Sequence, residues 1–446
     1  MKRWLSMGLW LALAAGSAAC GAASGSTEMK PAGPCELALA AQGGETALDR
    51  EIAGMQQELR ANANPRQRNA KIEQLGWAYV EKARGSFDPG YYKLAEQCAL
   101  CLEARPGRSE AEAQAPLAST KSIRAAALLL RGHALHSMHR FAEAEKIARE
   151  LVETRGLAFD FGLLGDVLME QGKLDESILA YQKMMELRPG PQAYSRAGHI
   201  RWLKGDLDGA RLLMRMAAQS AGGGDPDAAA WAWTRLALFE LQAGSPKRAH
   251  EMCDLALEMR GDYAPALLAR GRILLAEQRV DAALAPLQKA AGLNPLPETL
   301  WTLADALRAA GRNAEAEQVE ARLAATGPAN DPRTYALFLA TRGSRPAETR
   351  QLAEEELKAR RDVYTHDAHA WTQFAAGDAA GAWQSMRAAL AHDTQDARLF
   401  FHAALIAAQA GDAAAAKRYA DKAARLEAML LPGEQVRLRE WKTSRG

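Results

Sequence analysis

The chain has 446 residues, of which 25% are charged, and its formal net charge at pH 7 is only +2. It therefore lacks the basic excess that a general nucleic-acid-binding surface needs. Aromatic residues make up 6% of the chain, and alanine contributes 96 residues. Alanine favours helices but fills little core volume. The composition therefore excludes a β-rich fold and a large aromatic core and favours closely packed helices.

The amino-terminal residues 1–20 have the layout of a secretory signal. Lys2 and Arg3 supply positive charge, residues 4–15 are apolar, and residues 16–19 are small. The apolar run is shorter than the ~20 residues that a membrane-spanning helix needs. We therefore expect the chain to be exported, with no membrane-spanning helix of its own.

The end of this signal, Ser-Ala-Ala-Cys at residues 17–20, resembles the lipidation box of bacterial lipoproteins. Ser17 departs from that family, which prefers an aliphatic residue there. The resemblance implies that Cys20 is lipidated and that the protein is a periplasmic or outer-membrane lipoprotein, with the membrane reached only through this anchor. Cleavage after residues 21–23 would instead release a soluble secreted protein. The following stretch, residues 21–45, is rich in small residues and predicts a flexible tether.

Four further cysteines follow. Cys98 and Cys101 form a C-x-x-C pair without a second pair, which makes a zinc site a weak interpretation. The pair lies inside a helical pattern, whereas redox-active pairs use a helix amino terminus. We interpret both as small core residues. The alternative is a disulfide between Cys98 and Cys101, or from one of them to Cys35, because an exported protein meets an oxidising environment.

From about residue 46 to residue 430 the sequence repeats with a period near 34 residues. Small residues recur in the first helix of each unit, at Gly132, Gly165, Gly198, Ala237, Gly271, Ala304, Ala336, Ala370 and Ala404. Seven positions later the residue is Gly in seven of nine units, as expected where a helix ends in a left-handed turn. Twelve positions later it is Ala in seven of nine. Each unit therefore predicts a helix, a turn and a second helix that cross closely at small residues.

These registers resemble the tetratricopeptide repeat, whose first-helix signature is carried here by Leu75-Gly76-x2-Tyr79 and Leu164-Gly165-x2-Leu168. The resemblance implies an all-α solenoid of helical hairpins that coils into a right-handed superhelix. We expect about ten units over residues 46–430, a capping helix within residues 46–64, and a short closing segment at residues 431–446. The unit containing Ala336 is irregular, because Glu348 stands where the other units have Ala or Ser.

The repeat array leaves no stretch of 100–200 residues for a catalytic domain, and the chain lacks nucleotide-binding loops, metalloprotease motifs and hydrolase motifs. We therefore expect no enzymatic activity and no cofactor. In proteins with this repeat, the first helices line a concave surface that receives a peptide or a partner protein. The resemblance thus implies a non-catalytic interaction scaffold of the cell envelope, with another envelope or secreted protein as its partner and no nucleic acid.

Residues one and four positions after each small residue share the helix face that should line this surface. The chemically distinctive ones are Trp77, His133, His136, Asp166, Met169, His199, Trp202, Arg272, Asp305, Arg308, Trp371 and Phe374. Aromatic, Met, His and charged side chains together are typical of binding hot spots. The alternative is that the rings fill the space between repeats.

The histidines also admit a second interpretation, in which the protein is a periplasmic carrier of a metal or small ligand that uses His and Cys residues. His133, His136 and His139 are spaced at three residues, and the pair His133 and His136 could be joined by His199 from a neighbouring unit. All three of the first set cannot point at one ion easily, because three-residue steps drift around the helix. We therefore predict no metal site.

Overall fold

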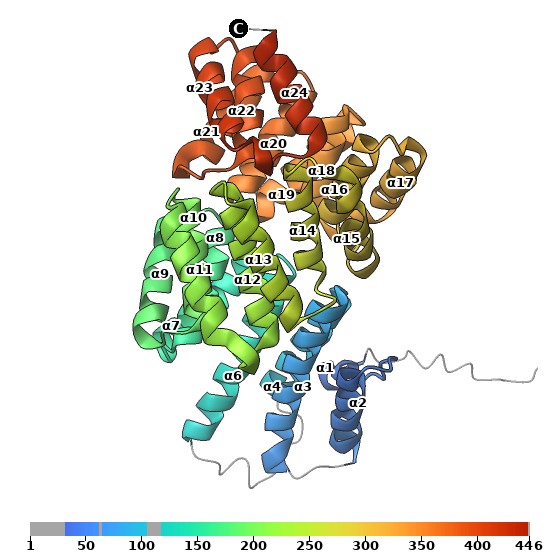
Figure 1. The fold of residues 1–446 in the computed structure, drawn as a ribbon. Coiled ribbons are helices and arrows are strands. Elements are labelled where there is room, and N and C mark those ends of the chain that lie inside the picture. The colour runs from blue at the N-terminus through green and yellow to red at the C-terminus, as the bar shows by residue number, and fades with distance from the viewer. Residues whose placement is uncertain (1–31, 62–64, 105–116, 445–446) are drawn as a thin grey trace, which may run out of the picture.

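The computed structural model describes residues 32–61, 65–104 and 117–444. The predicted signal and the Cys20 lipidation site lie outside these residues. Within them the chain forms α-helices and three short 3-10 helices, with no strand (Figure 1). None of these helices is long and apolar enough to cross a membrane.

The helices follow one another as short hairpins. Their bounds are α1 (Pro34–Ala38), α2 (Ala47–Arg60), α3 (Pro65–Ser86), α4 (Gly90–Ala104), α6 (Leu117–Ser137), α7 (Phe141–Thr154), α8 (Ala158–Glu170), α9 (Leu174–Leu187), α10 (Pro191–Leu203), α11 (Leu207–Ala221), η1 (Gly222–Gly224), α12 (Pro226–Gln242), α13 (Pro246–Met259), α14 (Ala264–Ala276), α15 (Val280–Leu293), α16 (Pro297–Ala309), α17 (Asn313–Asn330), α18 (Pro332–Arg342), α19 (Pro346–Ala359), α20 (Val363–Ala375), α21 (Ala379–Ala389), η2 (Leu390–His392), α22 (Ala397–Gln409), α23 (Ala413–Arg425), η3 (Glu427–Met429) and α24 (Pro432–Thr443). From α3/α4 to α22/α23 these pair as consecutive hairpins, which confirms the predicted all-α solenoid.

The small-residue positions lie where the two helices of a hairpin cross. A Cβ built on Gly165 would approach the Tyr181 ring to 2.3 Å, so only glycine allows this contact between α8 and α9. The glycine seven positions later, Gly172, has a φ of +75° and ends the helix in a left-handed turn. His139 and Gln278 stand at the same turn position in their units, and they also have positive φ values, 60° and 61°. The turn is therefore built even where glycine is missing.

The unit containing Ala336 departs from the others by one residue. Two residues, Ser344 and Arg345, separate the turn glycine Gly343 from the start of α19, whereas only Lys173 separates Gly172 from the start of α9. This shift exposes Glu348 and buries Thr349, whose hydroxyl donates to the Ser344 carbonyl at 3.0 Å. Glu348 therefore does not occupy the helix crossing, because Thr349 takes that place.

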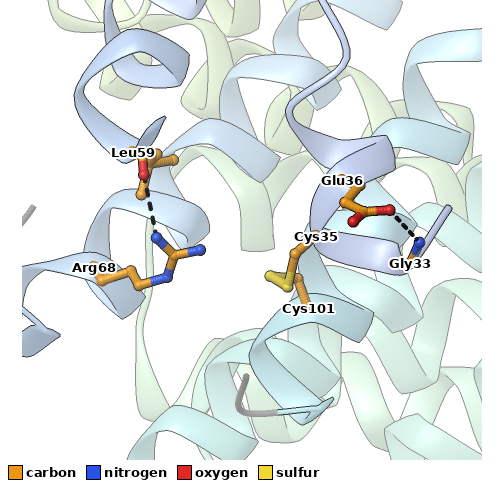
Figure 2. Close-up of a disulfide and its surroundings, with 6 residues drawn as sticks. All are labelled: Gly33, Cys35, Glu36, Leu59, Arg68 and Cys101. Atoms are coloured by element: carbon orange, nitrogen blue, oxygen red, sulfur yellow. Dashed lines mark hydrogen bonds between the residues drawn. A yellow bond between two sulfur atoms is a disulfide. The ribbon is translucent and has the colours of Figure 1, made fainter. Parts of the chain in front are cut away.

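The described part of the predicted flexible tether (residues 21–45), which begins at residue 32, is attached to the fold through α1. Residues 34–38 form α1, and Cys35 on α1 is disulfide-bonded to Cys101 on α4 (Figure 2). The Tyr79 hydroxyl on α3 donates to the carbonyl of Ala38 at 2.8 Å. The small-residue composition of this segment did not predict α1, because α1 is held by residues far along the chain rather than by its own helical propensity.

The disulfide also corrects the interpretation of Cys98 and Cys101 as two small core residues, because Cys101 is bonded to Cys35. Cys98 is buried as a free thiol, and its Cβ faces the backbone of Gly76 on α3, whereas Cys101 faces α1. Burial raises the pKa of the Cys98 thiol. Two cysteines three residues apart on one helix thus contact different neighbours, and the alternative pairing with Cys35 is the one that forms.

The coil of hairpins turns back on itself, so that later repeats contact earlier ones. The amide of Arg361 donates to the Glu170 carbonyl at 2.9 Å, and the Thr394 hydroxyl donates to the Leu203 carbonyl at 2.8 Å. Figure 1 shows the corresponding arrangement, with the orange and red helices α20 to α24 above the green helices α8 to α12. These contacts join residues about 190 positions apart and seal the inner side of the coil there.

The carboxyl-terminal helix closes the other side of the coil. Glu434 on α24 accepts from Arg398 at 2.7 Å, and Arg398 also reaches Glu298 on α16 at 3.4 Å. Arg272 on α14 donates to the carbonyl of Met429 in η3 at 2.9 Å. The segment after residue 430 therefore packs against the array as a closing element.

Candidate functional site

A cavity of about 1230 Å³ opens on the inner side of the first half of the coil. Its wall is formed by the first helices α3, α6, α8, α10 and α12 and by the start of α14. Six of the predicted groove residues line it, namely Trp77, His133, His136, Asp166, Met169 and His199. The helix face predicted from the positions one and four after each small residue therefore lines this cavity on α3, α6, α8 and α10.

Several cavity residues fall outside that rule. Arg196 and Arg235 stand two positions before the small residues of their units, and Arg84, Trp231 and Tyr263 also line the wall. Positions two before and one after the small residue are three apart, so they lie on one helix face. Extending the rule by one turn toward the amino terminus would have found both Arg196 and Arg235.

Asp166 is held by a charge-assisted network inside the cavity. The Arg196 guanidinium donates to its two carboxylate oxygens at 2.8 and 2.6 Å, and the Tyr181 hydroxyl donates to one of them at 2.7 Å. Burial opposes ionisation, but the Arg196 charge outweighs it and holds the pKa of Asp166 below its ordinary value. The negative charge of Asp166 is therefore already balanced by Arg196 on α10.

Burial favours the neutral form of the two α6 histidines, His133 and His136. Arg84 approaches His133 Nε2 to 2.7 Å, and since a guanidinium only donates, this nitrogen accepts. Burial, reinforced by the Arg84 charge, lowers the pKa of His133 to about 3. The Trp77 ring lies 5.5 Å from the His133 ring. His136 Nε2 is buried without a hydrogen-bond partner among the described residues, and burial lowers the pKa of His136 as well.

Arg235 lies deeper in the same cavity beside His199. Its guanidinium lies over the rings of Trp202 and Phe239, 5.6 and 5.3 Å from their centroids. Among the residues that the structure describes, no carboxylate or carbonyl forms a hydrogen bond or ion pair with it, and Asp396 attracts it without such a contact. Burial lowers the pKa of Arg235, and burial together with the Arg235 charge lowers the pKa of His199 to about 3.

Trp202 does not line the cavity, which corrects its predicted role as a groove residue. It is only 7% exposed, and its ring stacks on those of Phe239 and Tyr364 at 5.8 and 6.2 Å. Its Nε1 donates to Gln242 at 2.9 Å. Because α20 folds back over α10, the groove is filled here by the chain itself.

The other predicted groove residues are likewise engaged within the chain and do not line the cavity. Arg272 pairs with Glu298, Asp305 with Arg342, and Arg308 with Glu320; Trp371 stacks on His402 at 3.9 Å and lies 4.9 Å from Phe374. The open groove is therefore shorter than the array, because the closing helices occupy its second half.

The cavity histidines do not form the metal site considered as an alternative. In the described parts of the chain, no three His, Cys, Asp or Glu side chains are grouped so that they could hold a metal ion. His133 Nε2 is engaged by Arg84, and the neighbouring guanidinium charges disfavour a cation.

Comparison with known proteins agrees with this architecture. Residues 161–191 match the family model described as tetratricopeptide repeat. No curated protein matches the sequence significantly.

Among solved structures, the chain is similar to a tetratricopeptide repeat protein from Parabacteroides merdae, with 17% identity over 56% of this chain and 96% of the other, and a TM-score of 0.32. It is also similar to the Cut9 and Hcn1 hetero-tetramer of the APC/C, with 12% identity, 88% and 96% coverage and a TM-score of 0.36. A third is a monomeric mutant of IFIT1 with Gppp-AAAA, with 14% identity, 85% coverage of each chain and a TM-score of 0.46. Residues 161–191 are thus similar to one tetratricopeptide repeat, and helical hairpins of the same spacing continue on both sides of the matched segment.

Proposed function

We propose that the protein is an exported, non-catalytic scaffold of the bacterial cell envelope that holds a segment of a partner protein in the cavity of its first half. The observation that carries this proposal is the convergence of five first helices on one open cavity lined by aromatic, imidazole and charged side chains. Such mixed linings suit protein segments, because rings supply contact area and polar groups fix the register.

The export part of the proposal is supported by two independent features. The amino terminus reads as a secretory signal ending at Cys20, which we propose carries a lipid anchor. The Cys35–Cys101 disulfide is a bond typical of an oxidising compartment outside the cytosol. An anchored scaffold of this kind would present its cavity to other envelope or secreted proteins.

The cavity assignment is tested by removing two of its rings, Trp77 and Trp231. We expect the Trp77→Ala/Trp231→Ala double variant to lose cross-linking to the partner, because both side chains line the cavity and Trp231 is 39% exposed. Loss of contact area from two hot-spot rings should weaken binding at least tenfold. Partner identification after cross-linking in cells is the measurement, and circular dichroism checks the helix content.

The matched control is Phe159→Ala. This ring is 41% exposed but lies outside the cavity, next to Arg188. It should cross-link as the wild type does. Capture of the same partner by the double variant at wild-type yield would reject the cavity as the binding site.

A further inference from the structure

We infer that the segment held in this cavity presents a carboxylate, which pairs with the guanidinium of Arg235 where it lies over the rings of Trp202 and Phe239. The inference rests on the proposed function and specifies the chemistry of the partner: a polypeptide segment that presents one carboxylate, from an acidic side chain or a chain terminus, between apolar neighbours. It begins from the arginines of the cavity, which differ in how their charges are compensated.

Four arginines line the cavity. Arg196 is paired with Asp166, and Arg260 donates to Asp227 at 2.8 Å. Among the described residues, Arg84 contacts the His133 imidazole at 2.7 Å and forms no ion pair. Arg235 has ring contacts but no anionic or hydrogen-bonding partner among the described residues.

An uncompensated guanidinium inside a protein is costly, because its desolvation is not offset by an attracting charge. The neighbourhood of Arg235 offsets this cost only in part. Burial and repulsion from Arg272 leave its pKa lowered, although Tyr364 and Asp396 favour its charged form. Neither Tyr364 nor Asp396 forms a hydrogen bond or ion pair with Arg235. A group in this state gains most from an incoming anion, which supplies charge and acceptor oxygens together. The rings of Trp202 and Phe239 hold the guanidinium in one orientation, so the Arg235 side chain loses little conformational entropy when a ligand binds.

A carboxylate suits the site better than a polyphosphate chain does. The same cavity wall carries the carboxylates of Glu81 and Asp262, for which the described residues supply no ion pair closer than the 4.0 Å between Asp262 and Arg260. These carboxylates would repel a string of phosphates more strongly than a single carboxylate. One planar carboxylate matches the planar guanidinium fork. The mouth of the cavity exposes Phe87, Trp231 and Leu293, at 39%, 39% and 40%, which suits apolar side chains beside the acid.

An array of random decapeptides tests this, with every sequence made once with a free carboxyl terminus and once as the amide. The full-length protein is applied as wild type, Arg235→Met and Arg188→Met. Arg188 is the matched control, because its guanidinium also lies over a ring, that of Phe159 at 5.2 Å, but outside the cavity. We expect peptides bound by the wild type and by Arg188→Met to be enriched in Asp and Glu or in free carboxyl termini.

Arg235→Met should bind those peptides about tenfold to a hundredfold more weakly, which is the usual effect of losing one hydrogen bond to a charged group. Enrichment in both peptide sets identifies an acidic side chain, and enrichment confined to the free-acid set identifies a chain terminus. Bound peptides without acidic preference, or an unchanged preference in Arg235→Met, would overturn the inference while leaving the proposed function standing.

Two further outcomes distinguish a failure of the proposed function from binding of a phosphate chain. If the wild type binds no peptide at all, the proposed function fails together with the inference. If an oligoadenylate RNA displaces the bound peptides and Arg235→Met abolishes its binding, the site takes a phosphate chain and the carboxylate assignment is wrong.

Thermal unfolding of the unliganded protein checks that Arg235 is not simply a structural residue. Replacing an uncompensated charge by an apolar side chain of similar length should leave the melting temperature unchanged or raise it. A lower melting temperature in Arg235→Met than in Arg188→Met would show that the guanidinium stabilises the fold, and would contradict a role reserved for a ligand.

Discussion

At the residue scale, the cavity histidines link the stability of the fold to pH. The pKa values of His133 and His199 lie near 3 in the folded protein, well below the ordinary value of 6.5. Above pH 6.5 both rings are neutral in either state, and the fold keeps its full stability. As the pH falls from 6.5 toward 3, the unfolded chain takes up protons that the folded chain refuses, so stability is lost.

We therefore expect the free energy of unfolding to fall between pH 7 and pH 5, by at most about 2 kcal/mol for each ring. The His133→Gln/His199→Gln variant keeps polar side chains that do not titrate, so it should lose correspondingly less. Urea unfolding at the two pH values measures the difference. An identical loss in both proteins would show that other groups set the acid sensitivity.

At the scale of single helices, α1 depends on one covalent bond. The Cys35–Cys101 disulfide spans 66 residues of sequence, and a chain-entropy estimate for closing such a loop is about 4 kcal/mol. We expect Cys35→Ser to lower the melting temperature strongly and to make the α1 segment accessible to protease. Cys253→Ala, which alters a buried thiol outside any disulfide, is the control. Mass mapping of the oxidised wild type that links Cys98 instead would contradict the assigned pairing.

The helices themselves were predictable because their signals are local. The small residue at the crossing and the glycine of the turn lie seven positions apart, as at Gly165 and Gly172. The 3.6-residue helical period determines which side chains share the face that packs on the second helix. One added turn residue was enough to move the buried position from Glu348 to Thr349, and sequence spacing alone could not reveal it. The attachment of α1 was missed because it depends on partners far along the chain.

At the scale of the whole molecule, the closing of the coil decides which repeats can bind anything. Glu170 on α8 pairs with Arg360, which also contacts Asp362 at 3.2 Å, and the Arg361 amide donates to the Glu170 carbonyl. This closure turned half of the predicted groove into interior. Contacts between residues 190 positions apart leave no periodic trace in a sequence, and so Trp202 and Trp371 were expected on a surface that the fold covers.

We expect Arg360→Ala to loosen this closure without melting the hairpins, because it leaves Glu170 unpaired at the contact between the two halves. Small-angle X-ray scattering should show a larger radius of gyration at unchanged helix content. Arg149→Ala is the control, since its partners Glu145 and Glu176 lie in the same and the next hairpin. Equal dimensions for the two variants would mean that the backbone contacts alone keep the coil closed.

The turn at Gly172 carries a consequence for how such a chain can evolve. A Cβ at this position would come within 2.4 Å of the Arg361 carbonyl oxygen. The glycine that ends α8 therefore also allows the backbone at Arg361 to pack against this turn. Open solenoids readily gain or lose units by duplication, because each repeat contacts only its neighbours. Here an inserted or deleted hairpin between residues 172 and 361 would carry the two halves out of register. This contact can therefore survive substitutions and short loop changes in the stretch, but not the gain or loss of a whole repeat.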